Sequence, residues 1–293
     1  MKRRLGLLGI GRMGLPMAVN LINEGFEVTG YSRAGMERFV AAGGKPAASA
    51  REAVRGQEFV ITCLPGSADI LRQVIDEILE ALEPDAVLIE TSTHPLEAKR
   101  EAARRVEARG ATFLECEISG VPPMVAARRC VFFISGGSRA AFERARPIFD
   151  AITTTEKRYL GELGTATKIK LANNLLTCVH IAAAAEVLSL GVKAGLRADD
   201  MLALFGAGAG SSVMFTQRGP LMARRKFDES EGPFATLSKL PPAIQALAQE
   251  VGAATPMLDA AAVLYKRALD EGRAEQDVAA MIEIIESLRR QSG

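Results

Sequence analysis

Three glycines near the start of the chain have the spacing Gly9-x-Gly11-x-x-Gly14 and directly follow an apolar run. Residues 5–8 have the composition of a strand, residues 15–24 that of a helix, and residues 27–31 that of a second strand. This strand–turn–helix–strand order, more than the glycines alone, indicates a dinucleotide site with the pyrophosphate at the helix N-terminus. A tight turn that binds no ligand is the alternative.

The end of the second strand bears on which dinucleotide binds. An acidic residue there would hydrogen-bond the ribose 2′-OH of NAD, but this chain has Ser32 and Arg33. A hydroxyl and a guanidinium suit a 2′-phosphate, so the sequence favours NADP(H), with NAD(H) also possible. Alternatively, Arg33 is a solvated residue at the start of the next helix.

Hydride transfer to or from an alcohol also needs a general acid or base, and histidine is the usual one. The chain has two histidines. His94 follows an expected strand, at the edge where open α/β sheets place their crevices. His180 lies within an apolar helical stretch, where a packed core or interface residue is expected.

Lysine is the other source of the proton. Lys170 and Asn174 lie one turn apart on one face of an expected helix, 165–194. A desolvated lysine beside a cationic nicotinamide ring would have a lowered pKa and could exchange a proton near neutral pH. Lys168 should point to a different, solvated face. Lysine and asparagine are also ordinary residues on an exposed helix.

These residues must be positioned by two kinds of structure. The first half alternates expected strands (5–8, 27–31, 58–63, 86–91, 112–118 and 130–135) with expected helices (15–24, 34–43, 68–82, 95–109 and 138–150). This alternation predicts an α/β fold with a doubly wound, mostly parallel sheet of Rossmann type. The second half reads as helices only, at 165–194, 198–206, 236–252, 256–271 and 275–289. We therefore expect a nucleotide-binding domain at 1–162 and an all-α domain at 163–293, led by a long helix.

Composition narrows the function classes. The chain has 293 residues and a formal net charge of +1. It therefore lacks the excess of basic residues that would indicate binding to nucleic acid or to an anionic membrane. Four scattered cysteines indicate free thiols in a reducing compartment, so a cytoplasmic protein is expected. The apolar stretch 171–192 contains polar residues, which argues against a membrane span. Its alanine run, 182–185, suggests close helix packing in a homodimer or homotetramer, or is simply a good helix former.

Together these motifs resemble the β-hydroxyacid dehydrogenases, such as 3-hydroxyisobutyrate dehydrogenase and tartronate semialdehyde reductase, over nearly the whole chain. The resemblance implies that Lys170 is the general acid/base, that Asn174 orients it, and that Ser119 and Gly120 hold the substrate carboxylate. It also implies a set of cofactor contacts. They are Gly9, Gly11, Arg12, Met13, Gly14, Ser32, Arg33, Leu64, Pro65, Thr93 and Lys239.

The chain departs from the family's pattern around the substrate loop. Glu117 stands where a proline is usual, and Val121 replaces a second glycine. Arg128 and Arg129 follow where small residues and a Gly-Thr pair are usual. One of these arginines could face an anionic substrate group, or both could be solvated. The aspartate that usually follows Lys239 is absent.

Three functions fit these features. The first is an NADP(H)-dependent oxidoreductase that interconverts a small β-hydroxyacid and its semialdehyde or keto form. The second is an imine reductase of the same architecture, although such relatives usually carry Asp or Tyr in place of the lysine. The third is a non-catalytic NADPH-binding scaffold, which would be expected to lose Lys170. The sequence does not name the hydroxyacid or the direction of the reaction.

Overall fold

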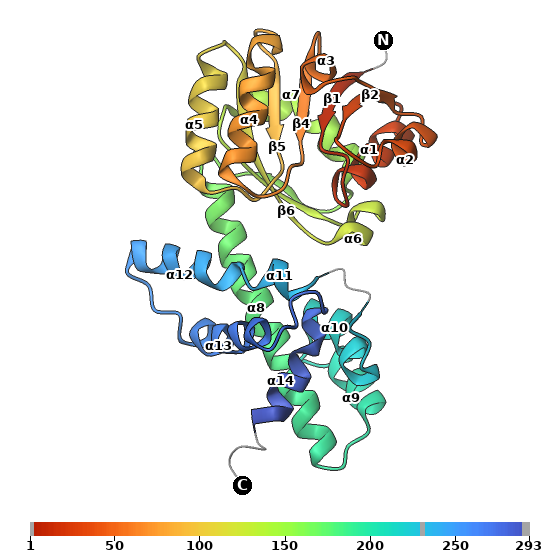
Figure 1. The fold of residues 1–293 in the computed structure, drawn as a ribbon, viewed down its shortest axis with the longest axis vertical. Coiled ribbons are helices and arrows are strands. Elements are labelled where there is room, and N and C mark those ends of the chain that lie inside the picture. The colour runs from red at the N-terminus through yellow and green to blue at the C-terminus, as the bar shows by residue number, and fades with distance from the viewer. Residues whose placement is uncertain (1–2, 229–231, 289–293) are drawn as a thin grey trace. The chain divides into compact units, whose positions relative to one another are not determined.

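The computed structural model describes residues 3–228 and 232–288. By its contacts the chain divides into residues Met1–Lys170, here called the sheet unit, and Leu171–Gly293, here called the helical unit (Figure 1). We expected a boundary after residue 162. The division falls later because α8 (Thr165–Lys193) begins within the sheet unit, where its first turn is bonded to the strand β6 (Thr112–Ser119).

The sheet unit alternates strands and helices, as the sequence predicted. The remaining strands are β1 (Arg4–Leu8), β2 (Glu27–Tyr31), β3 (Lys45–Pro46), β4 (Phe59–Thr62), β5 (Val87–Glu90), β7 (Val131–Ser135) and β8 (Lys157–Tyr159). The helices are α1 (Gly14–Asn23), α2 (Met36–Ala41), α3 (Ala50–Val54), α4 (Ala68–Ile78), η1 (Leu79–Ala81), α5 (Leu96–Glu107), α6 (Pro122–Ala126) and α7 (Arg139–Ile152). The sequence did not predict β3, β8, α3 or α6, because segments of two to five residues carry too little periodicity.

Within the described residues the strands form one eight-stranded sheet, in the order β3-β2-β1-β4-β5-β6-β7-β8. All neighbouring pairs are parallel except β6 and β7. The predicted doubly wound, mostly parallel sheet is therefore confirmed. Because β1, β2, β4, β5 and β6 run in one direction, their carboxyl ends lie along one edge, where such sheets bind ligands.

The two faces of the sheet pack different helices because side chains alternate along each strand. Leu7, Ile61 and Ile89 join a core with α1 and α7, whereas Val60 and Leu88 join a core with α3, α4 and α5. Figure 1 shows α4 and α5 together on one side of the sheet. On β6 the first core takes Leu114, Cys116 and Ile118, so Glu115 and Glu117 alternate onto the other face.

The helical unit contains no strand in its described part, as predicted. After α8 come α9 (Ala198–Ala207), α10 (Val213–Arg224), α11 (Phe234–Leu237), α12 (Leu240–Val251), α13 (Pro256–Asp270), η2 (Val278–Ala280) and α14 (Met281–Leu288). The sequence missed α10, which contains Gly219 and Pro220, since both residues weaken a helical pattern. The predicted helix 275–289 begins later, and its last residue lies outside the described residues.

By length and composition alone, α8 would qualify as a membrane span. Its buried residues, among them Cys178, Ile181 and Leu188, join the core of the helical unit. Three of the four alanines of the run 182–185 are buried in that same core. Most of the run therefore packs within the unit, and the large exposed apolar side chains of α8 are Leu176, Leu190 and Val192.

Candidate active site

The glycines in the turn between β1 and α1 serve two purposes: two of them are required by backbone packing, and one leaves space for a ligand. Gly9 has φ +91°, and a Cβ on it would lie 2.1 Å from the carbonyl oxygen of Cys63. A Cβ on Gly14 would lie 1.9 Å from the carbonyl oxygen of Gly9. A Cβ on Gly11 would meet no atom within 4 Å, and Gly11 is exposed. The fold thus requires Gly9 and Gly14, while the space at Gly11 is free for a ligand that approaches the backbone.

This turn fits a dinucleotide. No side chain caps the first turn of α1, so its N–H groups can bond an anion, which the helix dipole also favours. Arg12 and Met13 lie in the same turn, with Arg12 exposed. At the end of β2, Ser32 is half-buried and Arg33 is exposed. The predicted cofactor residues of the first two strands therefore lie at one edge of the sheet.

The two glycines give a test of this distinction. Gly11→Ala should leave the melting temperature nearly unchanged and weaken binding of the dinucleotide, because its methyl group occupies only the ligand's space. Gly14→Ala should lower the melting temperature, because its methyl group overlaps the backbone of Gly9. Thermal unfolding by circular dichroism and calorimetric titration of NADPH measure the two effects. A Gly11→Ala protein with wild-type affinity for both NADPH and NADH would contradict this assignment.

The loops after β4 and β5 are packed against each other. The N–H of Leu64 donates to Ser92 Oγ (2.7 Å), and Thr91 Oγ1 donates to the carbonyl of Thr62 (2.7 Å). A Cβ on Gly66 would lie 2.4 Å from the carbonyl oxygen of Thr93. Pro65 and Thr93 are exposed and Leu64 is half-buried. These loops bring the predicted contacts Leu64, Pro65 and Thr93 to the same edge as the glycine turn.

Lys170 lies in the second turn of α8 and reaches the end of β6. Its Nζ donates to the carbonyl oxygen of Ile118 at 2.5 Å, next to Ser119 and Gly120. Burial lowers the pKa of Lys170, the nearby Lys99 lowers it further, and Glu117 opposes that change. Lys168 is exposed. The lysine that the sequence selected is thus the one held at the strand end.

The predicted residues around Lys170 are placed as follows. Ser119 and Gly120 are half-buried at the end of β6, and Gly120 has φ +150°, where a side chain would be strained. Asn174 follows one turn after Lys170 on α8 and is 4% exposed. Among the described residues its Nδ2 has no hydrogen-bond partner. Buried amides are usually hydrogen-bonded, so this Nδ2 is a donor available to a ligand.

Glu115 fixes the start of α8 on β6. Its carboxylate accepts from the N–H of Gly164 (2.7 Å) and the N–H of Thr167 (3.2 Å), and also from the Thr167 hydroxyl. Ser135 Oγ donates to the same carboxylate and accepts from the N–H of Ala166. A carboxylate at a helix N-terminus satisfies free N–H groups and complements the helix dipole. Glu115 therefore sets where Lys170 lies, one turn further along the helix.

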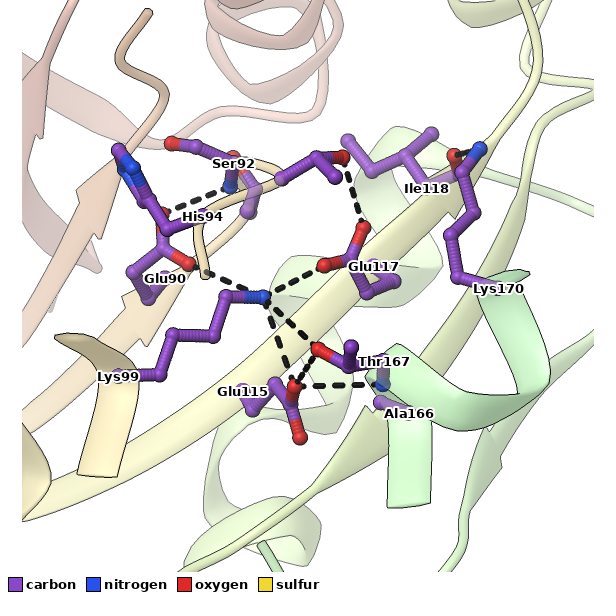
Figure 2. A network of polar contacts seen from close by, with 12 residues as sticks. Glu90, Ser92, His94, Lys99, Glu115, Glu117, Ile118, Ala166, Thr167 and Lys170 are labelled. Atoms are coloured by element: carbon purple, nitrogen blue, oxygen red, sulfur yellow. Dashed lines mark hydrogen bonds and ion pairs between the residues drawn. The ribbon is translucent and has the colours of Figure 1, made fainter. Parts of the chain in front are cut away.

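Lys99 of α5 lies at the centre of a buried cluster of charges, shown in Figure 2. Its Nζ is 2.5 Å from Glu117 Oε1, 3.5 Å from Glu115 Oε1 and 3.6 Å from Glu90 Oε2. The side chain of Lys99 is fully buried. Burial alone lowers the pKa of Lys99, but the three carboxylates outweigh it and raise that pKa. Lys99 is thus a permanent cation inside the protein.

The carboxyl groups around Lys99 differ in their protonation. Burial raises the pKa of Glu90 to about 7, although Lys99 and Ser92 oppose the rise. Burial also acts to raise the pKa of Glu115, but Lys99 and hydrogen bonds from Ser135, Thr167 and Gly164 bring it below its usual range. The sequence analysis singled out Glu117 but missed Glu90, Lys99 and Glu115. The one available signal was two acidic residues alternating within the apolar run 113–118.

His94 is a poor proton donor in this structure. It is 3% exposed, and burial together with Lys99 lowers its pKa to about 4. Its Nε2 lies 3.6 Å from Glu90 Oε1. The ring is therefore neutral at physiological pH. Of the two proton sources that the sequence offered at this edge, the geometry favours Lys170.

The protonation of Glu90 predicts a pH dependence of stability. Its pKa is about 7 when folded and 4.5 when free, so the stabilisation is complete below about pH 4.5 and is lost as the pH rises through 7. Relative to Glu90→Gln, which cannot titrate, the wild-type free energy of unfolding should fall by up to about 3 kcal/mol between about pH 5 and 8. Urea unfolding followed by circular dichroism measures this difference. Parallel pH profiles for the two proteins would contradict it.

The remaining sequence candidates lie apart from this cluster or have other partners. Arg128 pairs with Glu24 and donates to the carbonyl oxygen of Asp150 (2.6 Å), so it holds the α6–β7 turn to its neighbours. Arg129 is exposed, and Val121 is the N-cap residue of α6. Lys239 is exposed at the N-cap of α12 in the helical unit. Its contact with the cofactor stays a prediction.

Comparisons with known proteins identify the family of this chain. Residues 4–162 match the model of the NAD-binding domain of 6-phosphogluconate dehydrogenase. Residues 164–285 match the model of the NAD-binding domain of NADP-dependent 3-hydroxyisobutyrate dehydrogenase. An NAD-dependent L-serine dehydrogenase of Pseudomonas aeruginosa is 31% identical over 94% of this chain and 95% of its own.

Solved structures show the same architecture. A 3-hydroxyisobutyrate dehydrogenase of Mycobacterium tuberculosis with L-serine is 28% identical, with a TM-score of 0.84 over 97% of this chain and 99% of its own. A 3-hydroxyisobutyrate dehydrogenase of Salmonella typhimurium is 26% identical, with a TM-score of 0.87 over 97% of this chain and 100% of its own.

The sheet unit, its glycine turn and these matches define an NAD(P)-dependent oxidoreductase that acts on a CH–OH group. More narrowly, the chain belongs to the β-hydroxyacid dehydrogenase family. It binds a nicotinamide cofactor and acts on a small-molecule substrate.

Proposed function

We propose that this protein is an NADP(H)-dependent enzyme that interconverts a small β-hydroxyacid and its semialdehyde or keto form, with Lys170 as the general acid/base. The observation that carries the proposal is the position of Lys170. Its partly desolvated amine is held on the Ile118 carbonyl, beside Ser119 and Gly120 at the carboxyl end of the sheet. An imine reductase of this architecture usually has Asp or Tyr in place of this lysine.

Each residue has a role in this proposal. When bound at the glycine turn, a nicotinamide cofactor would supply the hydride acceptor or donor. Ser119 and the backbone of Gly120 bind the substrate carboxylate. In the oxidation direction the neutral amine of Lys170 takes the proton of the substrate hydroxyl, and in the reduction direction its ammonium returns a proton to the carbonyl oxygen. The Asn174 amide, which the described residues leave without a partner at Nδ2, orients the hydroxyl or the lysine.

Replacement of Lys170 tests the proposal directly. Lys170→Ala should lower kcat by roughly 10²–10⁴-fold, the usual contribution of a general acid/base. NADPH affinity should stay the same, because the glycine turn binds the cofactor's pyrophosphate. Lys170→Arg should be nearly as slow, since guanidinium does not release a proton near neutral pH. Steady-state kinetics on the hydroxyacid that turns over fastest give these values.

The matched control for this prediction is Lys168→Ala, which removes an exposed lysine two residues away on the same helix. This variant should retain near wild-type turnover. If Lys168→Ala is inactive while Lys170→Ala is active, the assignment of the catalytic lysine is wrong. If both variants are fully active, neither lysine transfers the proton.

The preference for NADP(H) rests on Ser32 and Arg33 at the end of β2. NADPH should bind more tightly than NADH, and Arg33→Ala should weaken NADPH binding by roughly 1.5–3 kcal/mol, the contribution of a hydrogen bond to a charged group. NADH binding should change little, because NADH has no 2′-phosphate. Calorimetric titration of both cofactors measures this. A wild-type protein that binds NADH as tightly as NADPH would contradict the preference.

The substrate class is proposed from the family and its named members. The relatives include an L-serine dehydrogenase and 3-hydroxyisobutyrate dehydrogenases, whose names denote small acids with a hydroxyl group on the β carbon. A panel of such acids, assayed with NADP⁺ and NAD⁺, would identify the substrate. The homodimer or homotetramer also stays a proposal. It is supported by the exposed leucines of α8, Leu176 and Leu190, rather than by the alanine run.

A further inference from the structure

We propose that Glu117 is a positioning residue for Lys170: together with Lys99 it forms a buried charge pair that controls how readily Lys170 gives up its proton. This inference rests on the proposed role of Lys170 and adds a residue to it. Glu117 does not touch the reacting atoms. It acts through the lysine that does.

The first step is the geometry of β6. Glu117 precedes Ile118, whose carbonyl oxygen accepts the hydrogen bond from Lys170 Nζ. The Glu117 carboxylate lies on the α5 face of the sheet and is buried, with 1% of its side chain exposed. Figure 2 shows Glu117 directed toward Lys99, with Ile118 and Lys170 beyond it along the strand. One strand segment thus holds both the charge and the acceptor for the lysine.

The second step is that Glu117 is held in place from both sides. Its Oε1 lies 2.5 Å from Lys99 Nζ, and its Oε2 accepts from Thr93 Oγ1 at 3.0 Å. Thr93 lies in the loop that we assign to the cofactor. A carboxylate fixed by two partners has little freedom to reorient, so its field at Lys170 is constant.

The third step is the balance of charges around Lys170. The titratable and charged groups of this region come from four elements: Glu115 and Glu117 on β6, Glu90 and the following His94 at β5, Lys99 on α5, and Lys168 with Lys170 on α8. His94 is neutral, Glu115 is bonded to the start of α8, and Lys168 is exposed. The charges that act on Lys170 are Glu117, which favours its ammonium form, and Lys99, which disfavours it.

The fourth step is the burial of the pair itself. The side chain of Lys99 is fully buried and that of Glu117 is 1% exposed, with 2.5 Å between Lys99 Nζ and Glu117 Oε1. Burial of such a pair is costly unless both ions are well bonded, so we assign it a role beyond packing.

The experiment measures the protonation of Lys170 without requiring turnover. Holoenzyme with saturating NADP⁺ is labelled with trace acetic anhydride, which reacts only with neutral amines, over about pH 6 to 10. The rate at Lys170 is read by peptide mass spectrometry, with exposed Lys168 as the internal reference. In Glu117→Gln the rate at Lys170 below the midpoint should rise by roughly three- to tenfold, because an opposite charge has been removed. The rate at Lys168 should stay constant.

Two further variants make the result specific. Glu90→Gln alters the same cluster by the same chemistry but removes no charge that acts on Lys170, so the Lys170 profile should not move. In Lys99→Gln/Glu117→Gln the opposing charge of Lys99 is removed as well, so labelling of Lys170 should lie between the rates of wild type and Glu117→Gln, because Glu117 acts on Lys170 more strongly than Lys99 does. This double variant buries no unpaired ion at the pair and remains informative if Glu117→Gln alone fails to fold. In that case a double-variant profile identical to wild type would overturn the proposal.

Turnover supplies the second readout. With the substrate identified by the acid panel, the acidic limb of kcat/KM for oxidation should move to lower pH in Glu117→Gln. A merely structural role would lower kcat without moving the limb. An unchanged Lys170 profile in folded Glu117→Gln, or an equal shift in Glu90→Gln, would overturn the proposal. If no acid turns over, the proposed function fails, yet the labelling profiles still decide the role of Glu117.

Discussion

The bonds between the Glu115 carboxylate and the first turn of α8 are the constraint on which the site depends. This carboxylate accepts from the N–H of Gly164 and the N–H of Thr167, so the helix must begin at β6. Lys170 then falls one turn later, within reach of the Ile118 carbonyl. A helix that began elsewhere would carry the lysine away from the strand end. Capping of this helix thus also positions the amine that we propose as the general acid/base.

Placing carboxylates inside the protein creates an electrostatic problem that Lys99 solves. Three carboxyl groups lie within 3.6 Å of its ammonium, and an isolated buried carboxylate would be strongly disfavoured. The three carboxyl groups are not stabilised equally. Glu115 and Glu117 are bonded by several donors, whereas Glu90 keeps a raised pKa near 7. The same cluster that anchors α8 therefore also makes stability depend on pH through Glu90.

The site combines parts shared with the family and parts particular to this chain. The glycine turn, the loops after β4 and β5, and the Lys170–Asn174 pair follow the family's pattern. Glu117 departs from it, and so does Arg128, which the structure assigns to the α6–β7 turn through its bonds to Glu24 and Asp150. We propose that Glu117 and its partner Lys99 tune the proposed proton transfer without touching the reacting atoms.

The sequence by itself determined the features that are encoded locally. Most strands and helices of the sheet unit follow from short apolar runs that alternate with helical patterns, and the glycine turn follows from three positions within six residues. The choice of Lys170 over Lys168 followed from its spacing to Asn174 together with the resemblance to the family's catalytic signature. Only the tertiary structure decided the charge cluster, because Lys99, Glu90, Glu115 and Thr167 come from four separate elements and meet through the packing of α5 and α8 on the sheet. No local pattern records which buried charges will face one another, since that depends on where each strand and helix lies in the folded protein.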